Sequence, residues 1–184
     1  MLGRRRNRRR RRLGERGAAA VEFALVVPVL LMLLFGTITG GLAFSRSNAT
    51  TNAVREGSRF GATTDASPTM ATAWANATIL RVQDTLFDGT GDASTVCVQL
   101  WKVGTGPVAN TGKCTTTAGG PALTLPTTET QEPAVPSNAN GTCVVRVLAA
   151  RPFTINIVLA RWDEVMVLSS TARYERKDKV PTCL

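Results

Sequence analysis

The chain contains no histidine among its 184 residues. Histidine is the commonest general base in enzymes and a frequent zinc ligand, so its absence argues against acid–base catalysis and against most zinc sites. The sequence also lacks a nucleophile elbow and a phosphate-binding glycine loop. Asp163 and Glu164 do not form a convincing catalytic pair, because adjacent residues of a strand point to opposite faces. We therefore predict no enzyme, no cofactor and no metal site.

Acidic residues are scarce at the N-terminus, where nine arginines fall within the first sixteen positions beside one acid, Glu15. Arginine tracts can neutralise phosphates, but no aromatic or glycine-rich pattern for stacking bases accompanies this one. The tract instead borders an apolar segment, where positive charge keeps the N-terminus in the cytoplasm. We predict that residues 1–17 are a basic cytoplasmic leader, too charged to fold, and that nucleic acid is not a partner.

Residues 18–44 are mostly Ala, Val, Leu, Phe and Gly. A helix over Ala18–Phe35 alone rises about 27 Å, which is close to the thickness of a bilayer core. We predict a transmembrane helix over residues 18–44, in contact with the lipid of the membrane. Four apolar side chains then recur near helical spacing and predict a helical stalk over residues 45–65: Ala49, Ala53, Val54 and Phe60.

Residues 66–184 are predicted to form an extracytoplasmic α+β domain. Ser67 and Pro68 predict the start of an amphipathic helix over Pro68–Phe87. Its expected apolar face is Met70, Ala73, Trp74, Ala77, Leu80 and Phe87. β-branched and alternating patterns predict a small antiparallel sheet of about three strands, at Ser94–Val103, Thr142–Ala150 and Glu164–Arg176.

Two connecting segments are less regular. Residues 104–141 are rich in Gly, Thr, Pro, Ser and Asn, and we expect a loop that is disordered around Thr127–Asn140. The segment Pro152–Trp162 is compatible with a short helix or an apolar loop.

All four cysteines follow the apolar segment, which predicts one or two disulfides in an oxidising compartment. Three full pairings exist. We favour Cys97 with Cys114, which closes a short loop, and Cys143 with Cys183, which ties down the C-terminus.

Two interpretations of the N-terminus compete. A cleaved signal peptide has a basic region, an apolar region and a site of small residues, here "GLA" ending at Ala43. Against it, the apolar run is long for a signal peptide, contains the acid Glu22 and lacks a clean A-x-A site. A secreted or membrane-anchored binding protein, with a disulfide-linked outer domain and no link to pili, is the corresponding alternative function.

The second interpretation rests on the segment "RGAAAVEFALVVPVLLMLLFG", in which a basic leader ends at Gly17 and small residues precede Glu22 and Phe23. It resembles the TadE-like minor pseudopilins of the tight-adherence, or Flp pilus, secretion machinery. Phe23 stands where the major Flp pilins usually have Tyr, which fits the minor class. "NAVREGSRFGA" at Asn52–Ala62 and "LSSTARYER" at Leu168–Arg176 are similar to two further segments of that family.

The resemblance implies a structural or assembly component of a Tad pilus in the bacterial cytoplasmic membrane, with its C-terminal domain outside. It implies that a prepilin peptidase cuts between Gly17 and Ala18. Its other partners would be pilin or pseudopilin subunits and the Tad membrane platform. Glu22 would then lie one helical turn from the new amino group of Ala18 and pair with that of a neighbouring subunit; alternatively, Glu22 reaches the membrane interface by itself.

The stalk segment carries a second charged cluster, formed by Arg55, Glu56 and Arg59. Glu56 and Arg59 are i,i+3 neighbours, a spacing that stabilises a helix by a few tenths of a kcal/mol, about 0.2–0.5. The cluster is either a contact for a partner or an ordinary solvated helix face.

Overall fold

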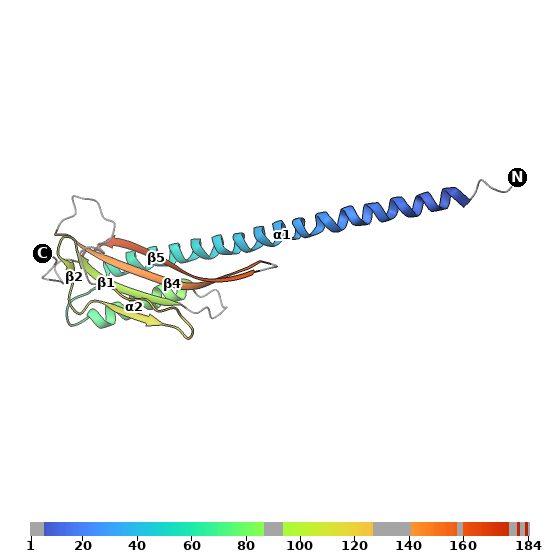
Figure 1. The fold of residues 1–184 in the computed structure, drawn as a ribbon. Coiled ribbons are helices and arrows are strands. Elements are labelled where there is room, and N and C mark those ends of the chain that lie inside the picture. Colours follow the sequence, from blue (N-terminus) through green and yellow to red (C-terminus); the bar gives the residue numbers. More distant parts are fainter. Residues whose placement is uncertain are drawn as a thin grey trace. The chain divides into compact units, whose positions relative to one another are not determined.

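The computed structural model describes residues 6–86, 94–126, 141–157, 160–176, 180 and 183. The elements in chain order are α1 (Arg6–Thr63), α2 (Ala71–Leu86), β1 (Thr95–Lys102), β2 (Gly106–Pro107), β3 (Lys113–Thr116), β4 (Cys143–Ile157) and β5 (Ala160–Arg173) (Figure 1). This arrangement confirms the predicted α+β class. Phe87 and the expected disorder at Thr127–Asn140 lie outside the described residues.

The chain divides into two units. One consists of Met1–Leu42 with Ile155–Trp162, and the other of Ala43–Thr154 with Asp163–Leu184, here called the outer unit. The predicted unfolded leader is wrong for Arg6–Gly17, because α1 begins at Arg6 and continues as one helix to Thr63. Arginine is a good helix former, and a turn added to an existing helix avoids the cost of nucleation.

The sheet has five strands rather than about three. Its order is β2-β1-β4-β5, and β3 pairs with the same edge of β1 as β2 does. β1 runs antiparallel to β4 from Thr95↔Ala150 to Lys102↔Cys143. The two additional strands are short and lie in the Gly- and Thr-rich segment that was expected to be a loop throughout.

The described residues of Pro152–Trp162 form neither a helix nor an apolar loop. β4 continues to Ile157 and β5 begins at Ala160, so these residues are the ends of two neighbouring strands. Thr154 and Ile155 are β-branched and favour strands. In the outer unit, the Thr154 hydroxyl donates a hydrogen bond of 2.7 Å to Asp163 Oδ1, which joins the two strands near this end.

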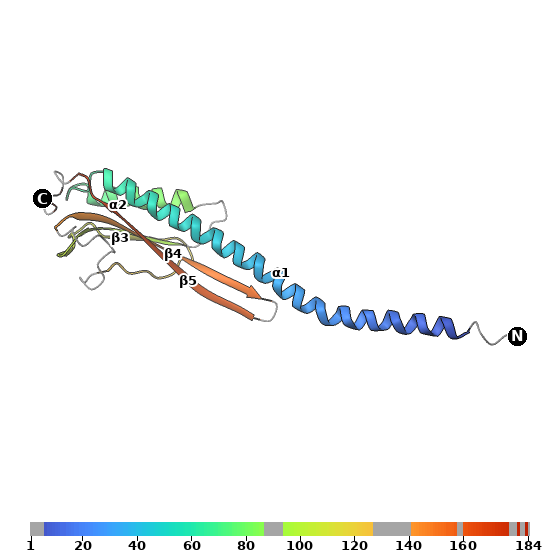
Figure 2. The same cartoon turned by 90° about the horizontal axis from the view of Figure 1, so that it is seen from above.

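The core of the outer unit lies between the sheet and the two helices, which cover the same face (Figure 2). From the sheet, Val96, Val98 and Leu100 alternate with residues of the opposite face. α2 begins three residues later than predicted, at Ala71. Among the described residues of its predicted apolar face Trp74 is buried, whereas Met70, Ala73, Ala77 and Leu80 are exposed, so that part of the prediction is wrong. Its buried residues are Ala71, Trp74, Ala75, Thr78, Ile79, Val82, Gln83 and Leu86.

A smaller cluster of Trp101, Val103 and Val144 lies on the opposite face of the sheet. The segment after β3 joins this face, where the Thr95 hydroxyl donates to the carbonyl of Pro121 at 2.5 Å. The guanidinium carbon of Arg146 lies 5.9 Å from the centre of the Trp101 ring. Burial beside this ring lowers the pKa of Arg146, because desolvation disfavours the charged form.

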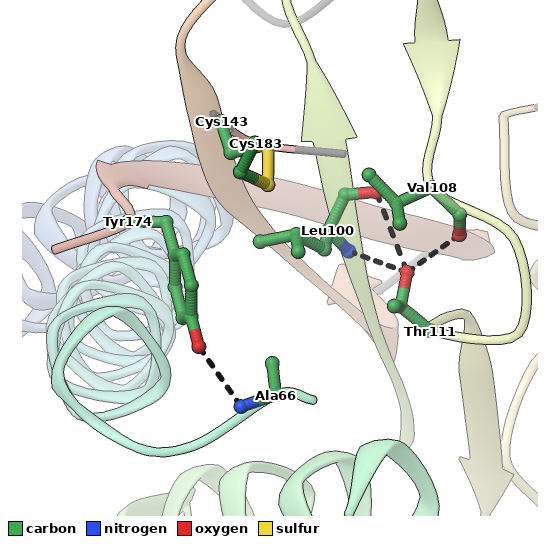
Figure 3. Close-up of a disulfide and its surroundings, with 7 residues drawn as sticks. All are labelled: Ala66, Leu100, Val108, Thr111, Cys143, Tyr174 and Cys183. Atoms are coloured by element: carbon green, nitrogen blue, oxygen red, sulfur yellow. Dashed lines mark hydrogen bonds between the residues drawn. A yellow bond between two sulfur atoms is a disulfide. The ribbon is translucent and has the colours of Figure 1, made fainter. Parts of the chain in front are cut away.

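The four cysteines form Cys97–Cys114 and Cys143–Cys183, the pairing that the sequence favours. The first links neighbouring strands with a Cα–Cα distance of 4.0 Å. The second links Cys183 to Cys143, the first residue of β4 (Figure 3). Figure 3 also shows the buried Tyr174, whose hydroxyl accepts a 2.9 Å hydrogen bond from the backbone N–H of Ala66.

Candidate assembly and partner-binding surfaces

The first candidate surface is the apolar part of α1. An 18-residue window of this helix has a mean hydropathy of 2.5, and none of that window is buried. Large side chains such as Phe23 and Leu25 are more than two-thirds exposed, at 70% and 72%. The polar Thr37 is satisfied within the helix, because its hydroxyl donates to the carbonyl of Leu34 at 2.8 Å. Such a surface is stable in lipid rather than in water, so α1 has the properties of a membrane anchor.

The predicted cleavage and assembly residues lie together at the start of this surface. Gly17, Ala18, Glu22 and Phe23 all belong to α1 and are all exposed. Glu22 follows Ala18 by one turn, so the two residues share a face of the helix. The bond between Gly17 and Ala18 is inside continuous helix, so a protease that requires an extended substrate must first unwind this turn. Glycine lowers the cost of unwinding by about 1 kcal/mol relative to alanine.

The second candidate surface contains Arg55, Glu56 and Arg59. The contact expected between Glu56 and Arg59 is wrong. Glu56 pairs with Arg81 of α2, with 2.9 Å between Oε1 and Nη2, and does not pair with Arg59. The Nε of Arg81 lies 3.3 Å from the same oxygen. Glu56 therefore pairs with a residue of the neighbouring helix and not with its i,i+3 neighbour on α1. Arg55 and Arg59 are exposed and form no ion pair with a described residue.

These arginines line a groove between α1 and β5. The groove has a volume of about 580 Å³ and is lined by Asn52, Arg55, Glu56, Ser58, Arg59, Ser170, Thr171 and Ala172. Its two sides are joined by the hydroxyls of Ser58 and Ser170, which lie 3.1 Å apart. A second groove of about 400 Å³ shares Arg59 and Ala172 and continues to Arg173 and Glu175. We call the two together the arginine groove; all of its residues belong to the outer unit.

Sequence reasoning missed the contacts that hold this part of α1 in place. The backbone of Gly57 packs against Val82 of α2, and Gly61 packs against Thr78 and Val145. The Nε1–H of Trp74 donates to the carbonyl of Gly61 at 2.9 Å. The sequence did contain an indication of this contact: Gly57 and Gly61 are four residues apart on a helix, a spacing that allows close helix packing.

The comparison with protein families matches residues 17–59 to the model described as TadE-like protein. This part of the chain is TadE-like. The TadE-like segment includes the candidate residues from Gly17 to Arg59 and confirms the resemblance proposed from the sequence. Neither a curated protein nor a solved structure matches the chain.

The TadE-like segment corresponds to most of α1 after its arginine-rich start. It supports a component associated with a Tad pilus, anchored in a membrane by this helix. The match does not extend to Leu168–Arg176, so the similarity of that strand to the family stays a prediction.

Proposed function

We propose that the protein is a minor pseudopilin, a structural or assembly subunit of a Tad pilus or a related secretion system. The observation that carries this proposal is the TadE-like match over the same helix that presents an exposed, lipid-compatible surface. A folded outer unit with two disulfides fits a position outside the cytoplasm, where disulfides persist. A general extracytoplasmic binding protein is less well supported, because it leaves Glu22 and the TadE-like match without a role.

The arginines before Gly17 support an orientation with the N-terminus in the cytoplasm. A prepilin peptidase at the cytoplasmic side would then cut between Gly17 and Ala18 and remove this positively charged anchor. Gly17 suits such a site because no atom outside its own helix lies within 4 Å of the position that a side chain would occupy. The small residues around it leave the backbone accessible to a protease.

Glu22 has an assembly role in this proposal. A carboxylate at the centre of a membrane helix costs about 2.5–3.5 kcal/mol on insertion scales. Glu22 lies near the cytoplasmic end, where the cost is smaller, and pairing with a cation would offset it. Cleavage creates an ammonium group at Ala18, and the Ala18 of a neighbouring subunit would supply it to Glu22. Such a pairing would set the axial register between neighbouring helices.

The test is mass spectrometry of the mature N-terminus from cells that contain the secretion machinery, with and without the prepilin peptidase. We expect a start at Ala18 only when the peptidase is present. A start after Ala43 would instead indicate a signal peptidase, and an intact N-terminus would indicate a simple anchor. Either result would overturn the processing part of the proposal.

Glu22→Gln tests the assembly role separately, with Thr37→Val as a matched control in the same helix. We expect Glu22→Gln to reduce co-purification with the other pilin subunits while the protein still inserts into the membrane. Unchanged co-purification would show that Glu22 only reaches the membrane interface and does not pair with a subunit.

A further inference from the structure

We infer that the arginine groove binds an extended, acidic peptide segment of a partner protein, with carboxylates at alternate positions. The inference goes beyond the proposed function, because it concerns the outer unit and requires neither cleavage at Gly17 nor filament assembly. It rests on three features of the groove: its positive charge, the spacing of its arginines and the strand edge along one side.

The charge of the groove is positive because its nearest acid is already neutralised. Glu56 is held by Arg81 of α2, with 2.9 Å between Oε1 and Nη2. Arg55, Arg59 and Arg173 are exposed and form no ion pair with a described residue. Within the described lining of the groove, Glu175 is the remaining acid. Three guanidinium groups against one carboxylate leave an excess of positive charge for an anionic partner.

The spacing of the arginines matches that of an extended chain. Arg55 and Arg59 are four residues apart on a helix, which separates them by about 6 Å along its axis. Alternate side chains of an extended peptide on one face are about 6.6 Å apart. Carboxylates at positions i and i+2 of such a peptide would therefore reach the two guanidinium groups together. Each would accept the paired N–H bonds that make arginine–carboxylate contacts strong.

The other side of the groove offers a strand edge. β5 ends the order β2-β1-β4-β5, so among the described strands β4 alone pairs with it. A strand edge without a second strand beside it presents backbone donors and acceptors that an extended peptide can use. Just beyond β5, the N–H of Glu175 is already taken, because it donates to the carbonyl of Ala62 in α1 at 3.0 Å. Thr171 and Arg173 lie at alternate positions of β5 and line the groove beside Ala172. A peptide is therefore favoured over a nucleic acid, for which the lining offers no aromatic side chain to stack on a base.

Fluorescence anisotropy tests the inference on the full chain in a neutral detergent. The probe is a labelled peptide of sequence TETETETE. An uncharged TQTQTQTQ and an equally charged TTEETTEE are the peptide controls, and a single-stranded oligonucleotide of the same net charge is the control for a general polyanion site. We expect saturable binding of TETETETE that weakens as salt is raised. The affinity for TTEETTEE should be weaker than that for TETETETE by about threefold or more.

The double variant Arg55→Gln/Arg59→Gln removes both guanidinium groups while leaving the packed face of α1 unchanged. We expect it to weaken binding of TETETETE by about tenfold or more, because two charge-assisted contacts are lost. Lys102→Gln/Lys113→Gln is the charge-matched control, since these residues lie on β1 and β3 outside the groove. It should change the affinity by less than about twofold. Circular dichroism confirms that each variant is folded.

Three results would overturn the inference. One is an absence of TETETETE binding by the wild-type protein. Another is equal weakening by the groove variant and the charge-matched control, which would indicate a nonspecific effect of net charge. The third is oligonucleotide binding that is tighter than peptide binding and is weakened by Arg55→Gln/Arg59→Gln, which would assign the groove to a different class of polymer.

Discussion

Gly57 of α1 lies against Val82 of α2, so close that a Cβ atom at position 57 would overlap Cγ2 of Val82. The next glycine on the same face, Gly61, accepts the hydrogen bond from Trp74 of α2 through its carbonyl. This close approach positions the end of α1 on the sheet, and the exposed Arg55 and Arg59 on its other side form the arginine groove. Packing on one face of the helix thus determines where the other face presents its charges.

Gly57→Ala is expected to destabilise the outer unit, although alanine is the better helix former. Alanine gains about 1 kcal/mol of helix propensity, whereas overpacking typically costs about 1–3 kcal/mol. We expect a net loss in the free energy of unfolding, measured by urea titration of the full chain in detergent. In a Gly57→Ala/Val82→Ala variant the added methyl gains room, so the double variant should lose less than the two single losses combined. Simple additivity would contradict the predicted overlap.

Tyr174→Phe should cost about 1–3 kcal/mol of stability, because it leaves the N–H of Ala66 buried without a hydrogen bond. The ring itself is retained, so the loss reports on the hydroxyl. The free energy of unfolding measures the effect. Phe153→Leu, at a partly exposed site of the sheet, is a comparison for general sensitivity to an aromatic substitution. A Tyr174→Phe variant as stable as wild type would mean that water replaces the hydroxyl.

The two disulfides should contribute unequally to stability. Cys97–Cys114 closes a sequence separation of 17 and Cys143–Cys183 one of 40. A loop-entropy model gives about 3 kcal/mol for the shorter loop and about 4 kcal/mol for the longer. In urea titrations under oxidising conditions, we expect the double Cys→Ser variant of Cys143–Cys183 to lose more stability than that of Cys97–Cys114. Wild type measured under reducing conditions should resemble the variant that lacks both bonds. The reverse order would indicate that native packing, rather than loop closure, sets the contribution.

The sequence predicted the elements whose pattern is local. The apolar run, the existence of α2 and the positions of three main strands follow from periodicity and β-branched composition, and each appears in the structure. β2 and β3 were missed because their pairing depends on β1, while their own Gly- and Thr-rich sequence favours turns. Strand length was underestimated in β4 and β5, because the apolar segment between the two predicted strands is also compatible with a short helix or a loop.

The face of α2 was mispredicted for a tertiary reason. The apolar residues of α2 are compatible with more than one stripe, and the contacts of Gly57 and Gly61 decide which stripe is buried. The partner of Glu56 was missed for the same reason, since Arg81 is distant in sequence. Of the candidate sites, the sequence alone identified the membrane-edge residues around Glu22 and the arginines. The groove itself required β5, whose approach to α1 no local pattern encodes.

A double-mutant cycle distinguishes the two possible partners of Glu56. The side chains of Arg81 and Glu56 are 52% and 45% exposed, so their pair should contribute only about 0.2–1 kcal/mol, and less at high salt. Coupling between Glu56→Gln and Arg81→Gln is expected within this range in urea titrations at low salt. Coupling between Glu56→Gln and Arg59→Gln, the matched control one turn along α1, should be near zero. A larger coupling with Arg59 than with Arg81 would mean that Glu56 turns toward the groove, and its carboxylate would then compete with an acidic peptide for the arginines.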